Sequence, residues 1–275
     1  MAPMPAASPA LLRLANLVLP LVQPLAGALA PAFGIGMSNA EMTRLSETPV
    51  VPAGYAFSIW GPIFLAAIAY GVWQALPAQR GDALLARLRG PLALAFLLNI
   101  AWMVTSQLIG NGWHLVAILA LIVAAMGTAL LRLPRGRAGP PPRAAARWLV
   151  VPLVGLWAGW ASAAAFANLS ITARWAEFGW FGLSPIGAAM LVILAATGFG
   201  AALLRRSGGN PWYAGGLAWA LVAIIVANLG PRGLNPPVAI VAGLCLALLG
   251  LVLVLSRREA AARPAAAGQP HPASA

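Results

Sequence analysis

The sequence predicts an all-α membrane protein, a polytopic bundle of about eight transmembrane helices. Of its 275 residues, 61% are hydrophobic and only 8% are charged, whereas a soluble domain carries about 25% charged residues. Apolar runs of roughly 20 residues recur along most of the chain, and a helix of that length crosses a hydrocarbon layer of about 30 Å. Runs of this length indicate helices rather than the shorter alternating strands of a barrel.

Loop signals divide the apolar sequence into eight predicted spans. In chain order they are Leu11–Phe33, Tyr55–Leu76, Pro91–Ile109, His114–Leu133, Trp148–Asn168, Pro185–Leu204, Trp212–Leu229 and Pro237–Leu255. Pro20 and Pro24 interrupt the first span. Proline is tolerated in a spanning helix, which it kinks, so the first run still counts as a span.

The arginines predict which way the spans face. All 17 basic residues are Arg, against five acidic residues, for a net charge of +12. With both termini in the cytoplasm, fourteen arginines fall on the cytoplasmic side, among them Arg80, Arg87 and Arg89 between the second and third spans. The three on the other side are Arg44, Arg174 and Arg232. Since cytoplasmic loops retain positive charge, this alternation predicts eight spans with both termini cytoplasmic.

The composition also narrows the cell type and the partners. A chain rich in Ala, Gly and Pro and without Lys is typical of a GC-rich bacterium, which places the protein in a bacterial inner membrane. Because the arginines alternate with hydrophobic spans, they indicate membrane topology rather than nucleic-acid binding. The lipid bilayer is therefore the first predicted partner.

Several classes of function lack their usual residues. No acidic or basic residue lies in the middle of a predicted span, which disfavours a proton-driven pump. The chain has no phosphate-binding loop, zinc-protease motif or Ser/His/Asp grouping, and its single Cys245 excludes an internal disulfide. We therefore expect neither an enzyme nor an obligatory cofactor.

Aromatic and amide side chains remain as candidates inside the membrane. In the fifth span Trp157, Trp160, Ala164 and Asn168 fall within a stripe about 80° wide on a helix. The stripe has two interpretations: indoles and amides that pack helices together, or one wall of a pocket for a flat aromatic ligand. The small residues at 161–165 predict that another helix approaches closely there.

Three motifs in the first five spans resemble one known family. The stretch PAGYAF at 52–57, the pair Asn99-x-x-Trp102, and Trp160 with Asn168 eight residues later are similar to motifs of the tryptophan-rich sensory protein family. This is the family of the translocator protein, or peripheral benzodiazepine receptor. The motifs occur in the family's order on the second, third and fifth spans.

The resemblance implies a five-helix bundle with tryptophan-lined walls that binds porphyrins and other planar hydrophobic molecules. It covers about residues 10–170, so we expect a five-helix core at 1–170, three additional helices at 171–256 and a disordered tail at 257–275. The tripeptide ANL occurs in both parts, at 167–169 and 227–229. This three-residue match is too short to define a sequence repeat.

The entrance to the second span is the third candidate feature. Pro52 and Gly54 allow a loop to fold tightly over the start of the helix, and Tyr55, Phe57 and Trp60 would point from there into the bundle. The alternative is a helix start with aromatic side chains at the membrane interface.

These observations lead to one functional hypothesis and one alternative. The first is a membrane-bound sensory or binding protein for a tetrapyrrole, a porphyrin or haem, or a sterol-like planar ligand; a homodimer is also predicted. The alternative is a small-solute permease, and enzymatic porphyrin breakdown ranks last because no catalytic group is visible. The predicted ligand-binding residues are Tyr55, Phe57, Trp60, Asn99, Trp102, Trp157, Trp160 and Asn168.

Overall fold

The computed structural model of the chain describes residues 8–38, 41, 48–134, 144–180, 182–230 and 234–262. These residues form helices and connecting turns without any strand. Eight of the helices are long and apolar enough to cross a membrane, which confirms the predicted fold class and number of spans.

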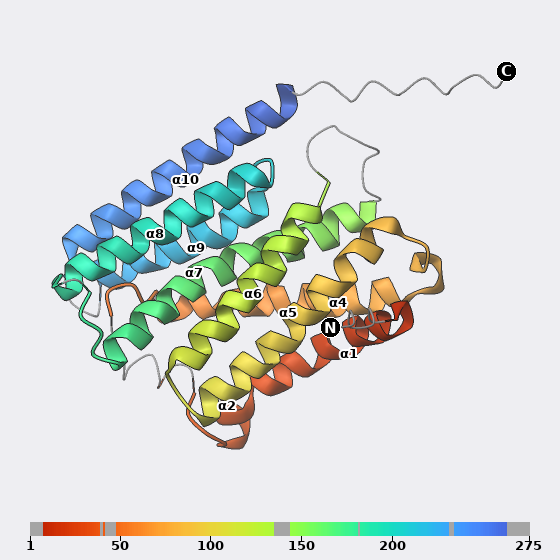
Figure 1. Cartoon of the computed structure of the whole chain (residues 1–275), viewed down its shortest axis with the longest axis horizontal. Coiled ribbons are helices and arrows are strands. Elements are labelled where there is room, and N and C mark those ends of the chain that lie inside the picture. Colours follow the sequence, from red (N-terminus) through yellow and green to blue (C-terminus); the bar gives the residue numbers. More distant parts are fainter. Residues whose placement is uncertain are drawn as a thin grey trace, which may run out of the picture.

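The spanning helices and the short elements between them follow one another along the chain (Figure 1). The spanning helices are α1 (Pro9–Gly27), α4 (Trp60–Ala75), α5 (Ala83–Leu108), α6 (Trp113–Arg132), α7 (Val151–Trp175), α8 (Pro185–Arg206), α9 (Pro211–Leu229) and α10 (Pro236–Ala262). The short elements are α2 (Leu29–Phe33), the 3-10 helices η1 (Gly54–Ile59) and η2 (Pro77–Gln79), and the π turn η3 (Ala146–Val150).

Polar caps fix where several helices begin. The side chains of Ser8, Asp82, Ser184 and Asn210 accept hydrogen bonds from backbone N–H groups in the first turns of α1, α5, α8 and α9. In three of these four helices a proline follows the cap directly, where its missing N–H costs nothing. The caps thus fix the first residue of each of these helices near the start of its apolar run.

The first five spans pack into a ring. Helix α1 contacts α4 and α5, α5 contacts α6, α6 contacts α7, and α7 contacts α4 to close the ring. The last three spans contact one another and pack on the ring through α7 (Figure 1). Helix α7 is therefore the element shared by both groups.

Small residues bring α7 and α9 close together. A side-chain Cβ built on Gly155 would lie 2.6 Å from the Cβ of Trp212, and one built on Gly159 would overlap the carbonyl oxygen of Tyr213. On the facing helix, a Cβ on Gly216 would lie 2.5 Å from the carbonyl oxygen of Leu156. This is the close approach that a Gly-x-x-x-Gly pattern permits in membranes. At 161–165, where the sequence predicted a close approach, the hydroxyl of Ser162 lies 3.2 Å from that of Tyr213 on α9.

Several predicted boundaries differ from the structure. The first span stops at Gly27, and a separate short helix, α2, covers the remaining residues as far as Phe33. The second span begins as a 3-10 helix before Trp60. Helix α10 continues to Ala262, beyond the predicted start of the tail at 257, and the rest of the tail lies outside the described residues.

The third span begins earlier than predicted, which changes the environment of one arginine. Since α5 starts at Ala83, Arg89 lies two turns inside the helix and is only 3% exposed. Its guanidinium donates to the side-chain oxygen of Gln74 at 3.1 Å and to the backbone oxygen of Gln79 at 2.9 Å. The carbonyl oxygens at the end of α4 carry partial negative charge, so they compensate a cation that the sequence placed in a loop.

Buried amides hold α1 against α5 along most of the bundle. At one end Asn16 donates to the carbonyl oxygen of Arg89 at 2.8 Å, and midway Asn99 donates to the side-chain oxygen of Gln23 at 2.7 Å. At the other end Gln107 donates at 2.8 Å to a carbonyl oxygen in the last turn of α1. We call this row of paired amides the polar seam.

Candidate functional site

Four of the predicted residues border one cavity. It encloses about 70 Å³ between η1 with its preceding loop, the second half of α5 and the second half of α7. Phe57, Trp102, Trp160 and Asn168 all line it, together with Pro52 from the loop. We call it the indole cavity. Three segments that the sequence singled out separately thus meet at a single void.

Three polar atoms around the indole cavity are buried without a hydrogen-bond partner among the described residues. They are the indole nitrogens of Trp102 and Trp160 and the side-chain oxygen of Asn168. Most buried polar groups in folded proteins are paired, and an unpaired one costs about 1–3 kcal/mol. Three residues of the cavity lining therefore carry, between them, two N–H donors and one acceptor that the described residues leave unpaired.

Other buried polar atoms without a partner belong to residues that do not line this cavity. The indole nitrogen of Trp157 and an amide nitrogen of Gln23 are also buried without a partner. Gln23, however, uses its oxygen to accept from Asn99. The convergence of three such atoms on one void distinguishes the indole cavity from these cases.

The aromatic rings around Trp160 meet edge to face. Its ring lies 6.0 Å from that of Phe57 and 6.5 Å from that of Trp60, with interplanar angles of 86° and 90°. Trp60 stacks in turn on Phe64 at 5.3 Å and does not line the cavity. Among the predicted ring residues, Trp60 therefore supports Trp160 from behind.

The remaining three predicted residues lie away from the indole cavity. Trp157 is fully buried and stacks on Phe96 of α5 at 5.2 Å, and Asn99 belongs to the polar seam. The expectation that Tyr55 points into the bundle is wrong. Tyr55 is 44% exposed and packs edge-on against Trp219 of α9 at 5.5 Å, because the 3-10 turn directs it toward the seventh span.

The structure adds one cavity residue that the sequence reasoning missed. Asn111, in the turn between α5 and α6, also lines the indole cavity. Its signal was available: a polar residue between two glycines, at the same end of the bundle as the 52–57 motif. Asn228 of the second ANL lies near by as well, and donates to the carbonyl oxygen of Pro49 at 2.8 Å.

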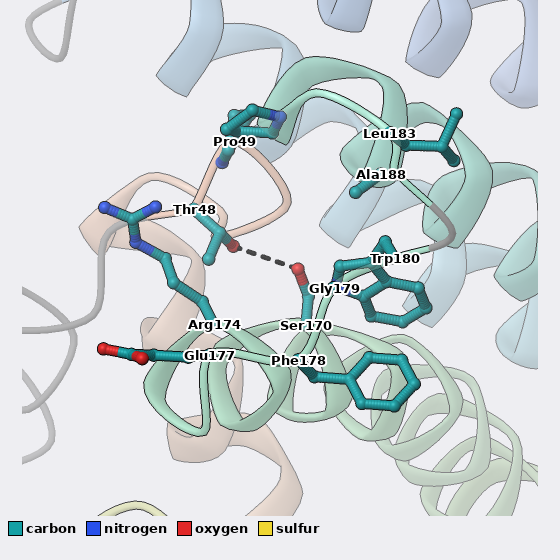
Figure 2. A pocket seen from close by; sticks show the side chains of 11 residues that line it. Thr48, Pro49, Ser170, Arg174, Glu177, Phe178, Gly179, Trp180, Leu183 and Ala188 are labelled. Atoms are coloured by element: carbon teal, nitrogen blue, oxygen red, sulfur yellow. Dashed lines mark hydrogen bonds between the residues drawn. The ribbon is translucent and has the colours of Figure 1, made fainter.

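A second cavity of about 330 Å³ is lined by Thr48 and Pro49 of the loop before η1 (Figure 2). Its floor carries a hydrogen bond of 3.3 Å from the hydroxyl of Ser170 to that of Thr48. Trp180 forms part of its wall, while Arg174 and Glu177 extend to one side, away from Trp180 (Figure 2). We call it the hydroxyl cavity after the hydrogen bond between Ser170 and Thr48.

Comparison with known proteins supplies the family. The model of one family, described as TSPO-like protein, matches residues 13–255. The chain belongs to the TSPO-like protein family. The match runs through the first seven spans and to within a few residues of the end of the eighth, so it includes the helices that the motif resemblance left uncovered. A search of the curated proteins and of the solved structures finds no match.

Proposed function

We propose that this TSPO-like protein binds a tetrapyrrole, or a similar planar apolar molecule with polar substituents, and that the indole cavity is part of its binding site. One observation carries the proposal: two indole N–H groups and one amide oxygen are buried around a single void without partners. A porphyrin carries carboxylate oxygens that accept hydrogen bonds, pyrrole N–H groups that donate them, and a flat ring that suits aromatic walls. Family membership supports the same class of ligand.

The decisive measurement is a titration of protoporphyrin IX, followed by its own absorbance, against detergent-purified protein. The variant Trp102→Phe/Trp160→Phe keeps both rings but removes both N–H donors. We expect its Kd to rise about 10-fold, since each neutral hydrogen bond contributes about 0.5–1.5 kcal/mol. Trp175→Phe is the matched control, because Trp175 ends α7 and is exposed. An equal Kd for all three proteins would refute a role of the indoles in binding.

The alternative function, a small-solute permease, is favoured by the polar seam. From Arg89 to Gln107 the seam extends over a stretch of α5 that is about 27 Å long at 1.5 Å per residue, most of the hydrocarbon thickness. Its amides donate to backbone oxygens or, for Asn99, to the side chain of Gln23, which packing alone explains. Swelling of proteoliposomes in glycerol or urea tests this alternative. A rate no higher than that of protein-free vesicles would remove it.

We further propose that the protein lies in a bacterial inner membrane with both termini in the cytoplasm. The arginine distribution supports this orientation. It places the indole cavity near the periplasmic end, because the 48–57 segment and the turn at Asn111 are at the end of the bundle opposite the termini. A reporter fused after residue 140 should register as cytoplasmic and one fused at Gly179 as periplasmic. Both on one side would contradict this topology.

A further inference from the structure

The segment at 48–59, which leads into α4, is fastened to α9. Asn228 donates to the carbonyl oxygen of Pro49 at 2.8 Å, and the backbone N–H of Ala53 donates to the carbonyl oxygen of Ala223 at 3.0 Å. Further along, the indole N–H of Trp219 donates to the carbonyl oxygen of Ala56 at 2.8 Å. The bonded residues follow one another in opposite order in the segment and in α9, so the segment lies antiparallel beside the helix.

The same segment contributes to the walls of both cavities. Thr48 and Pro49 line the hydroxyl cavity, whereas Val51, Pro52 and Phe57 line the indole cavity. Helix α7 forms the opposite wall of both, through Ser170 in the first and Asn168 in the second. Because the segment lines both cavities, we call it the partition.

The volumes indicate why the partition matters. The indole cavity, at about 70 Å³, is well below the roughly 300–1,000 Å³ of a typical small-molecule site. With the 330 Å³ of the hydroxyl cavity it reaches about 400 Å³. A planar ligand that uses the indole donors therefore needs part of the wall to move. The partition, unlike the walls from α5 and α7, lies before the start of a long helix.

We propose that residues 48–59 form a gate between the two cavities and that α9 is its latch, with Trp219 and Asn228 as positioning residues. In the closed state α9 holds the gate against α7; in the open state the two cavities join into one site for the planar ligand. The identity of that ligand rests on the proposed function. The latch itself gives the seventh span, which lies outside the motif resemblance, a role in access to the site.

The latch predicts in which direction the apparent Kd changes when it is weakened. A ligand that binds only the open state has an apparent Kd equal to its intrinsic Kd divided by the open fraction. Weakening the latch raises the open fraction, so binding becomes tighter. Trp219→Phe keeps the ring beside Tyr55 and removes the N–H that bonds Ala56. We expect protoporphyrin IX to bind this variant about 3- to 10-fold more tightly, with a faster association rate.

The experiment pairs this titration with hydrogen–deuterium exchange of the peptide covering 48–59, for which no ligand is needed. Trp212→Phe is the matched control: it is the same substitution at the start of α9, away from the gate. The proposal requires faster exchange in the Trp219 variant but not in the control, together with tighter porphyrin binding.

Each of the other experimental outcomes would overturn one part of the proposal. Unchanged exchange in Trp219→Phe would show that α9 does not latch the segment. Faster exchange with equal or weaker binding would show that the closed gate, rather than the joined cavity, is the binding form. If the wild-type protein does not bind protoporphyrin IX at all, the proposed function fails, while the exchange data still decide the latch.

Discussion

Helix α7 is packed in two different ways along its length. Its first half is pressed against α9 through Gly155 and Gly159, and Trp157 fills the space toward α5. Its second half carries small and polar residues, Ala164 and Asn168, that border a void. The comparison shows that small residues produce opposite results: facing a helix backbone they allow close contact, and facing a loop they leave a cavity.

The two tryptophans of α7 belong to different halves of this comparison. Trp157 and Trp160 are both buried and both have unpaired indole nitrogens. They differ by 60° around the helix, which directs Trp157 to Phe96 and Trp160 to the indole cavity. A difference of three residues thus separates a packed ring from a ring that lines a cavity.

The largest expected effect is a loss of stability when Trp157, in the closely packed half of α7, is replaced. Trp157→Ala removes a fully buried ring that stacks on Phe96 and should lower the free energy of unfolding by about 3–5 kcal/mol. Trp160→Ala should cost less stability, because its ring already borders a void, but should weaken porphyrin binding. Thermal unfolding and porphyrin titration on both variants check this. If Trp157→Ala proved the more damaging to binding in folded protein, the two assignments would be reversed.

A medium effect is expected where α7 meets α9. Gly159→Ala places a methyl group against the carbonyl oxygen of Tyr213, and such overpacking costs about 1–3 kcal/mol. Gly215→Ala is the control on α9: no atom lies within 4 Å of the added methyl, so alanine should stabilise the helix by about 0.5–1 kcal/mol. The unfolding temperature should fall in the first variant and rise in the second. A fall in both would mean that helix propensity does not decide the effect at Gly215.

Much of this architecture was accessible from the sequence. Hydropathy is a property of each span by itself, so the eight helices followed from composition and loops. The cavity residues Trp160 and Asn168 followed from helical periodicity and from a motif resemblance, since both lie on one stripe of one helix. The sequence could not separate Trp157 from this stripe, because both interpretations of the stripe place it on the same face.

The features that the sequence missed depend on contacts between distant segments. The burial of Arg89 follows from the backbone oxygens of Gln74 in α4 and Gln79 in η2, which hydropathy does not register. The fastening of the 48–59 segment by Trp219 and Asn228 joins residues more than 160 positions apart. The tripeptide ANL was visible twice in the sequence. Only the fold shows that Asn228 donates to Pro49 and that Asn168 lines the same cavity as Pro52.

The smallest expected effect compares two buried amides. Asn99 is paired with Gln23, whereas the side-chain oxygen of Asn168 is unpaired at the cavity. Asn99→Leu leaves Gln23 without its partner and should lower the free energy of unfolding by about 1–3 kcal/mol. Asn168→Leu replaces an unsatisfied acceptor by an apolar group of similar size, so stability should stay equal or rise by up to about 1 kcal/mol.

The same substitution at Asn168 should nevertheless weaken porphyrin binding, because an acceptor for the ligand is lost. A gain in stability together with a loss of binding is the signature of a polar group retained for a ligand rather than for the fold. Urea unfolding and porphyrin titration of Asn99→Leu and Asn168→Leu measure both quantities on matched variants. A loss of stability in Asn168→Leu equal to that in Asn99→Leu would mean that Asn168 pins helices together, and the case for a ligand at the indole cavity would then rest on Trp102 and Trp160 alone.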